Sequence, residues 1–295
     1  MTPMISMIQW RLLDSGASSG ARNMALDEAI LAELEAGRSP PTVRVYGWNP
    51  PCITLGHSQR PETELDLPKV REQGFHVAMR ATGGRAVLHV DELAYSVIAP
   101  ADATAWCGSQ SQSYQFISQA LASALTGEGF GVALDRGYPT EKPAAMRAMT
   151  PCFSSTARSE VVWNGKKVVG SAQRRRRDCF LQHGSILVAD AHRLIVRCLN
   201  LNEEKHARYL EILDANSVSL ERIAGQPLDW RALADGFLPR FAEALGIAYR
   251  MGECTEQESV LAGTLELAKL RFQEELWSGV AKASGASMTR EAVHA

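Results

Sequence analysis

The chain has 295 residues, of which 45% are hydrophobic, so it can bury the core of one large domain or of two modest ones. Its 31 basic and 33 acidic residues give a formal charge of −2, which excludes an overall field that would draw the molecule onto nucleic acid or an anionic membrane. Six widely separated cysteines, and the lack of a signal peptide or a run of about 18 apolar residues, predict a cytoplasmic protein that is not exported.

The first predicted elements are a helix and two strands. Apolar residues recur at helical spacing over residues 23–34, with Asp27, Glu28 and Glu33 between them, which predicts an amphipathic helix. Gly37 and two prolines end it. Strands are then predicted over residues 42–48 and 52–55.

Further strands are predicted over residues 75–89, where two glycines interrupt the pattern, and over residues 93–98. A helix over residues 114–125 follows. Asn164-Gly165 joins two β-prone runs within residues 158–169, and this pair is typical of a type I′ hairpin turn.

Beyond Val188 the pattern becomes helical, with an apolar stripe over residues 230–245 and a charged helix over residues 256–276. Residues 246–252 indicate a short strand and a turn that could belong to either side of a boundary. The sequence therefore predicts a catalytic domain over residues 1–250 and a C-terminal helical extension over residues 251–295.

Residues 80–89 form the first cluster of candidate site residues. Adjacent glycines let a backbone turn sharply and approach a ligand, while arginine and histidine supply hydrogen-bond donors for a phosphate, a carboxylate or a carbonyl oxygen. A hairpin with a glycine turn and two surface arginines explains the same pattern, and both interpretations stay open. The candidates are Arg80, Thr82, Gly83, Gly84, Arg85 and His89.

Cys152 is the candidate nucleophile. A free cysteine is most often a small buried hydrophobe, and it becomes a nucleophile only where its thiol pKa is depressed. Lys167 lies just past the Asn164-Gly165 turn, so the hairpin can return its ammonium group toward the cysteine loop, where it would favour the thiolate and polarise a carbonyl group.

The third cluster consists of small and polar residues over two segments, with four arginines between them. Glycine within strands often marks the close approach of a ligand, although close packing of two strands explains it equally well. The four arginines, residues 174–177, indicate a solvated turn or a docking patch for an acidic carrier protein. The candidates for substrate binding are Gly170, Ser171, Ala172, His183, Gly184 and Ser185.

Other kinds of site find little support in the sequence. His89 and His183 have no cysteine or carboxylate partners at metal-ligand spacing, so no metal site is predicted. No Gly-x-Ser-x-Gly elbow, phosphate-binding loop or dinucleotide fingerprint occurs.

Four of these segments together, in this order and spacing, resemble the lipoate–protein ligase and octanoyltransferase superfamily: residues 80–89, 151–153, 164–173 and 181–187. Residues 23–28, 46–51 and 55–59 fit as well, so the resemblance covers about residues 10–250. Within it, Pro151-Cys152-Phe153 looks most like the cysteine-dependent octanoyltransferases of the Gram-positive type. Met79 and Val90 depart from the family pattern, where an arginine and an aspartate are usual, and this bears on substrate preference.

The resemblance implies a fold and the role of each site residue. The fold is α/β (α+β), with mixed, largely antiparallel β-sheets flanked by helices, as in biotin and lipoate ligases. Cys152 would carry the acyl group, and Lys167 would lower the pKa of its thiol. Residues 82–89, 170–172 and 184–186 would line the pocket for the acyl group and the carrier arm.

The resemblance also implies the partners. The donor would be the octanoyl-phosphopantetheine arm of acyl carrier protein, with no further cofactor. The acceptor would be a lysine of a lipoyl-domain protein, such as the glycine cleavage H protein or a 2-oxoacid dehydrogenase subunit. We expect a monomer that binds neither nucleic acid nor a membrane. An ATP-dependent lipoate–protein ligase, an amidotransferase between lipoyl domains and a non-enzymatic binding module remain as alternatives.

Overall fold

The computed structural model describes residues 8–104, 106–135 and 159–283. Its largest sheet has six strands in the order β10-β11-β6-β2-β1-β12. Strand β1 pairs in parallel with both β2 and β12, whereas the β10–β11, β11–β6 and β6–β2 pairs are antiparallel. The strands are β1 (Trp10–Ser18), β2 (Thr42–Trp48), β6 (Leu93–Pro100), β10 (Val169–Arg176), β11 (Cys179–Ile186) and β12 (Tyr249–Met251).

Two three-stranded sheets complete the β-structure, in the orders β4-β3-β5 and β7-β8-β9. In the first, β3 pairs in parallel with β4 and antiparallel with β5, and in the second both pairs are antiparallel. Mixed, largely antiparallel sheets flanked by helices confirm the predicted fold class. The strands are β3 (Cys52–Leu55), β4 (His76–Met79), β5 (Val87–His89), β7 (Ala133–Leu134), β8 (Val161–Trp163) and β9 (Lys166–Lys167).

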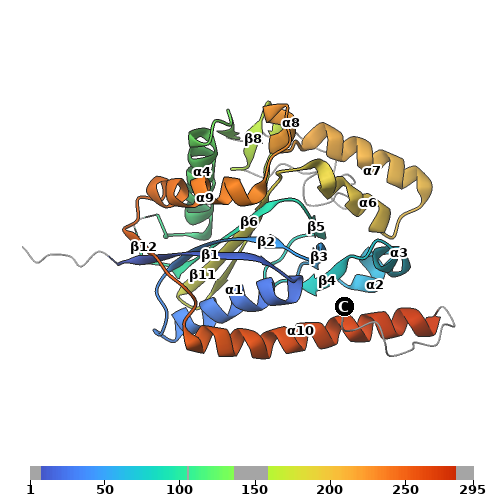
Figure 1. Ribbon diagram of the computed structural model, residues 1–295, viewed down its shortest axis with the longest axis horizontal. Coiled ribbons are helices and arrows are strands. Elements are labelled where there is room, and N and C mark those ends of the chain that lie inside the picture. Colours follow the sequence, from blue (N-terminus) through green and yellow to red (C-terminus); the bar gives the residue numbers. More distant parts are fainter. Residues whose placement is uncertain (1–7, 105, 136–158, 284–295) are drawn as a thin grey trace, which may run out of the picture.

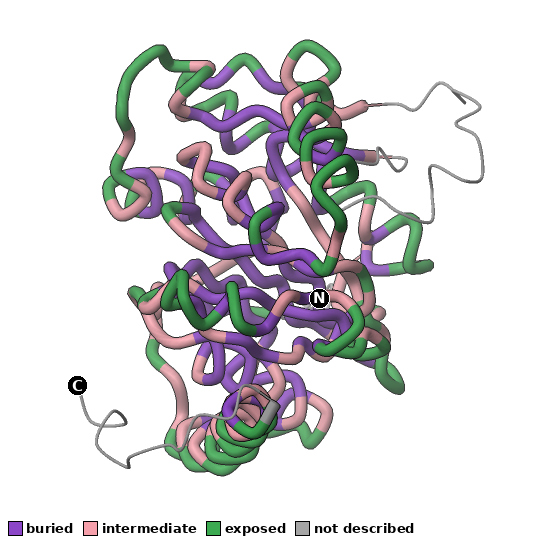
Figure 2. Tube along the Cα trace, turned by 90° about the vertical axis from the view of Figure 1, so that its right-hand side faces the viewer, coloured by how far each residue is buried: buried purple, intermediate pink, exposed green. Residues whose placement is uncertain are grey.

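Helices cover both faces of the six-stranded sheet (Figure 1). Helix α1 (Gly20–Glu35) lies on one face, and α4 (Gln110–Gly127) and α9 (Trp230–Ala244) lie on the other. Figure 2 shows the buried residues concentrated along the strands and the inner sides of these helices. The remaining helices are α2 (Pro61–Glu64), α3 (Leu67–Glu72), the 3₁₀ turn η1 (Asp190–Leu194), α6 (Ile195–Cys198), α7 (Glu203–Asn216), α8 (Leu220–Ala224) and α10 (Glu256–Ala283).

Local sequence signals explain where the predicted elements begin and end. The hydroxyl of Ser19 accepts a hydrogen bond from the Arg22 backbone and so caps α1, and Gly37 follows the helix with a φ of +70°. Asn164 and Gly165 have φ values of +48° and +76°, as a type I′ turn requires, so the hairpin prediction is confirmed. The first residue of the predicted hairpin segment, Arg158, lies outside the described residues.

Helix α10 extends to Ala283, seven residues beyond the predicted end, and it packs along α1 (Figure 1). An ion pair of 2.6 Å between Arg11 in β1 and Glu258 in α10 is buried from solvent. Strand β12, which precedes α10, joins the sheet through β1. The predicted boundary near residue 250 stays a prediction. The segments before and after it contact each other through β1, β12 and α10.

None of the helices within the three described ranges combines the length and the apolar character that crossing a membrane requires.

Candidate functional site

A cleft of about 430 Å³, including space open to solvent, lies between the six-stranded sheet and the β4-β3-β5 sheet. Eight of the candidate binding residues line it, as does Val87 from the predicted range 82–89, together with four others that were not predicted. The lining residues are Met24, Tyr46, Trp48, Thr54, Arg80, Val87, His89, Gly170, Ser171, Ala172, His183, Gly184 and Ser185.

The small residues of β10 and β11 form one wall of this cleft because the two strands pair there in register. Ser171 lies opposite Gly184. A Cβ atom on Gly184 would come within 2.2 Å of the Gly170 carbonyl oxygen and 2.8 Å of the Tyr95 ring. Close packing therefore requires glycine at position 184. Because these residues have small side chains or none, the backbone of the two strands faces the cleft.

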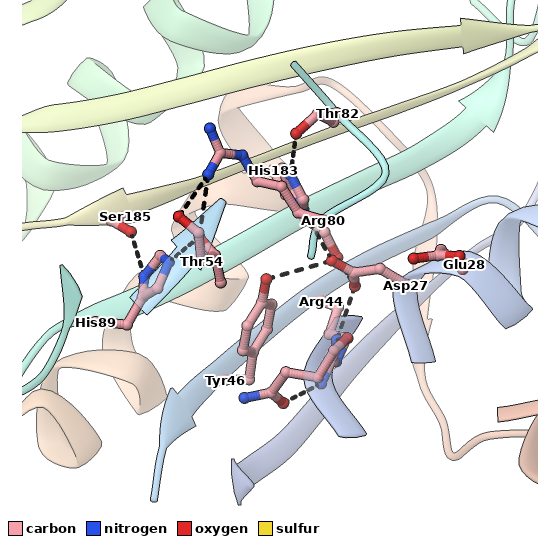
Figure 3. Close-up of polar contacts among 12 residues, drawn as sticks. Asp27, Glu28, Arg44, Tyr46, Thr54, Arg80, Thr82, His89, His183 and Ser185 are labelled. Atoms are coloured by element: carbon pink, nitrogen blue, oxygen red, sulfur yellow. Dashed lines mark hydrogen bonds and ion pairs between the residues drawn. The ribbon is translucent and has the colours of Figure 1, made fainter. Parts of the chain in front are cut away.

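Asp27 is the centre of a buried polar network beneath the cleft (Figure 3). Its carboxylate accepts hydrogen bonds from Arg44 Nη1 at 2.7 Å and Ser96 Oγ at 3.0 Å, and it lies 3.1 Å from His183 Nδ1. Burial by itself raises the pKa of Asp27, but the charges and hydrogen bonds of Arg44 and His183 outweigh it, so the pKa is lower than usual. Asp27 is therefore held as a carboxylate.

His183 connects this network to the segment that follows β4. A carboxylate can only accept hydrogen bonds, so Nδ1 donates to Asp27, and Nε2 is hydrogen-bonded to the Thr82 hydroxyl at 2.7 Å. Both ring nitrogens are thus bonded within the chain. His183 fixes Thr82 against the wall of the cleft.

His89 is held by a second set of contacts on the opposite wall. Its Nδ1 lies 2.6 Å from Glu92 Oε1, and its Nε2 lies 2.7 Å from the Thr54 hydroxyl. The ring stacks on Trp48 with centroids 3.9 Å apart. Burial lowers the pKa of His89 despite the opposing charge of Glu92, which favours the neutral imidazole. Ser185 also donates to Glu92, at 2.7 Å.

Arg80 holds the glycine-containing segment in place (Figure 3 shows its bonds to Thr54). Its guanidinium group donates to the carbonyl oxygens of Thr54, Gly83 and Arg85 at 2.7–3.2 Å. Arg80 lines the cleft, whereas the other four predicted residues of this segment do not. Those four are Thr82, Gly83, Gly84 and Arg85.

Lys167 lies in β9 with its side chain 5% exposed, and its Nζ is 2.9 Å from Glu160 Oε1. This lysine is not among the residues that line the cleft. It lies three residues before Gly170, the first lining residue of β10, so it adjoins this strand along the chain. Cys152, its predicted partner, lies outside the described residues.

The arginines after Gln173 make contacts within the chain. Arg174 donates to the Ala81 carbonyl oxygen at 2.7 Å, Arg175 donates to the Cys107 carbonyl oxygen at 2.8 Å, and Arg176 lies 3.4 Å from Glu35. Arg177 has a φ of +50° in the turn between the strands. Arg174, Arg176 and Arg177 are nevertheless exposed, so a solvated turn and a docking patch both stay open.

Asp27, Glu92 and Glu160 orient site residues, but the sequence reasoning did not select them. The amphipathic pattern predicts Asp27 on the polar side of a helix, whereas the residue is 1% exposed. The signal available was its place in residues 23–28, a segment that already matched the family pattern. Within the described ranges, no group of three or more histidine, cysteine or acidic residues could hold a metal ion.

Asp27→Asn is expected to lower the free energy of unfolding by about 3–5 kcal/mol, because it leaves the Arg44 guanidinium buried without a carboxylate. Urea denaturation at pH 7 measures this change. Since the folded-state pKa of Asp27 lies below the usual 3.8, its contribution is complete above that value and disappears as the pH falls through the folded-state pKa. The difference in the free energy of unfolding between Asp27→Asn and wild type should therefore become smaller as the pH falls through the folded-state pKa of Asp27.

Glu266→Gln is the matched control. It breaks a partly exposed ion pair between Glu266 in α10 and Arg22, which lies in α1 as Asp27 does. Its expected effect is below about 1 kcal/mol. Equal denaturation midpoints for Asp27→Asn and the control would contradict the central role given to Asp27.

Comparison with known proteins identifies the family. Residues 19–242 match the lipoyl protein ligase A/B catalytic domain. The chain is 38% identical to the octanoyltransferase LipM of Kyrpidia tusciae, over 88% of this chain and 95% of that protein. It is 39% identical to the octanoyltransferase LipM of Symbiobacterium thermophilum, over the same shares.

Among solved structures, the bipartite lipoate protein ligase of Thermoplasma acidophilum is similar, with a TM-score of 0.71 and 22% identity over 88% of this chain and 92% of that one. This likeness supports the lipoate ligase fold that the sequence predicted. The chain therefore belongs to the lipoyl protein ligase A/B catalytic domain family, together with the LipM octanoyltransferases.

Proposed function

We propose that this protein transfers an octanoyl group from acyl carrier protein to a lysine of a lipoyl-domain protein, through a thioester on Cys152. The assignment of octanoyl transfer in protein lipoylation is supported by the LipM relatives, which match about nine-tenths of the chain. The observation that carries the proposal is the cleft, with the buried Lys167 three residues before Gly170 on its β10 wall. To this assignment the proposal adds two features: acyl carrier protein as the octanoyl donor and a thioester intermediate on Cys152.

The remaining cysteines support Cys152 as the nucleophile. Burial raises the thiol pKa of all five cysteines in the described ranges, to about 11 for Cys198. A thiol with a raised pKa is almost entirely protonated at neutral pH and attacks carbonyl groups poorly. Cys152 is thus the cysteine of this sequence left to carry an acyl group.

The cleft suits a medium-length acyl chain. Met24, Trp48 and Val87 give it an apolar lining, while the polar residues around them are bonded to the protein itself. Each buried methylene group contributes about 0.8 kcal/mol, so acyl groups two carbons shorter or longer should be discriminated only modestly.

The chemistry consists of two exchanges at one carbonyl carbon. The Cys152 thiolate attacks the thioester carbonyl, the bond to the pantetheine sulfur breaks, and that sulfur leaves as a thiol after it takes up a proton. The neutral lysine amine of the acceptor then attacks the Cys152 thioester, the nitrogen loses one proton to solvent, the bond to the Cys152 sulfur breaks, and an amide and the Cys152 thiolate are released. The Lys167 ammonium group would stabilise the thiolate and the oxyanion in both exchanges. No nucleotide is consumed.

The first test is intact-protein mass spectrometry of the wild-type protein mixed with octanoyl-acyl carrier protein in the absence of ATP. We expect a mass gain of one octanoyl group, mapped to the peptide containing Cys152 and discharged by adding the glycine cleavage H protein in its unmodified form. A parallel reaction contains free octanoate and ATP. If the acceptor is modified only in that reaction, the protein is an ATP-dependent ligase, and the proposal fails.

A third reaction replaces octanoyl-acyl carrier protein with an octanoylated lipoyl-domain protein as donor. A faster adduct from that donor would identify an amidotransferase and would overturn the choice of acyl carrier protein, while keeping the thioester.

A further inference from the structure

Helix α10 contacts the outer edge of strand β4. In the β4-β3-β5 sheet β4 is an edge strand, so the backbone groups on its free side need other partners. Gln273 Oε1 accepts a hydrogen bond from the Val77 backbone at 2.9 Å, and Lys269 Nζ donates to the Met79 carbonyl oxygen at 3.1 Å. Two side chains, one helical turn apart, therefore replace a missing neighbouring strand.

Lys269 also connects α10 to α1. Its Nζ lies 2.7 Å from Glu28 Oε1, and its side chain is 14% exposed. Met79 immediately precedes Arg80, whose guanidinium group lines the cleft. A single ammonium group thus fixes the end of β4 relative to α1 at the point where the cleft wall begins.

The adjacent residue of α1 fixes the other end of the same short segment. Asp27 accepts a hydrogen bond from His183 Nδ1, and His183 Nε2 is hydrogen-bonded to the Thr82 hydroxyl. Figure 3 shows Asp27 and Glu28 side by side, with Asp27 at the centre of the buried network. Residues 79–82 are therefore anchored to α1 at both ends, through Lys269 at Met79 and through His183 at Thr82.

We propose that α10 is a positioning element of the acyl cleft and that Lys269 is its positioning residue, which holds the Arg80 wall at the width that fits the octanoyl chain. The proposal deepens the proposed function and rests on it for the identity of the ligand. Lys269 does not touch the substrate. It acts through Met79 and the segment that follows.

The test compares three variants of the full chain. Lys269→Met removes both polar contacts and keeps a long apolar side chain, and Lys269→Arg restores the cation. Arg22→Met is the matched control, because it breaks another α1–α10 ion pair, Arg22–Glu266 at 3.4 Å, that does not reach β4. Thermal melting of each variant checks that it is folded at the assay temperature.

The first readout is hydrogen exchange of peptides spanning residues 77–90, which needs no activity. Lys269→Met should speed exchange there about threefold or more, because a local opening loses its anchor, and the other two variants should match wild type. The second readout is octanoyl transfer. Lys269→Met should raise KM for the octanoyl donor by about tenfold, with a smaller change in kcat, and should flatten the preference for eight carbons over six or ten.

Unchanged exchange at residues 77–90 in Lys269→Met overturns the inference, whether or not the protein transfers octanoyl groups. An equal effect of Arg22→Met also overturns it, because general packing of the two helices would then explain the change. If exchange changes in Lys269→Met but the wild-type protein forms no octanoyl adduct, the proposed function is refuted, while the role of Lys269 in holding residues 79–82 is retained.

Discussion

Cys152→Ser is expected to abolish the octanoyl adduct and to lower the rate of octanoyl transfer more than about 10³-fold, because a serine hydroxyl stays protonated where a cysteine thiol ionises. The adduct is measured by intact mass and the transfer by modification of the acceptor protein. Acyl carrier protein binding should persist, since the change removes one sulfur atom and leaves the cleft intact.

The matched control is Cys254→Ser, at a partly exposed cysteine whose thiol pKa is raised, chiefly by burial. It should keep both the adduct and the turnover of wild type. If Cys152→Ser transfers octanoyl groups as fast as this control does, the protein either acts without a thioester or serves only to bind the acyl group.

Lys167→Met is expected to slow formation of the acyl-enzyme by about 10²- to 10³-fold, the usual cost of losing one group that stabilises an oxyanion. The rate is measured by rapid quenching and mass spectrometry. This substitution also leaves the buried Glu160 carboxylate without its lysine, which costs about 3–5 kcal/mol of stability. A loss of rate could therefore reflect partial unfolding.

A double variant separates the two effects. Adding Glu160→Gln to Lys167→Met removes the charge of the Glu160 carboxylate and should recover most of the stability, while the acylation rate stays low. Lys166→Met is the neighbouring control, because its ammonium group donates to the Asp214 carbonyl oxygen on another element. Recovery of the rate in the double variant would show that Lys167 supports the fold and not the chemistry.

The sequence predicted the elements well because their signals are local. Helical spacing gave α1 and α9, and the Asn164-Gly165 pair gave the β8–β9 hairpin. The predicted site residues on β10 and β11 come together because the two strands pair directly. Each of these features depends on residues that lie close in the chain.

The orienting contacts could not be read in this way because their partners are far apart in the sequence. Asp27 meets His183 across 156 positions, and Lys269 meets Met79 across 190. In a helix, a charged residue between apolar ones indicates a solvent-exposed side, and only the packing of α10 and the sheet reveals that these charges are enclosed. The position of the cleft between two sheets was hidden for the same reason.

The pairing of β1 with β12 has a consequence for protein synthesis. The Arg11 guanidinium leaves the ribosome well before its carboxylate partner, Glu258, which follows 247 residues later. Until then, enclosing Arg11 in the sheet would cost several kcal/mol for an uncompensated charge. The nascent chain is therefore expected to complete its central sheet only after the start of α10 has emerged, and until then its exposed strands need protection from aggregation.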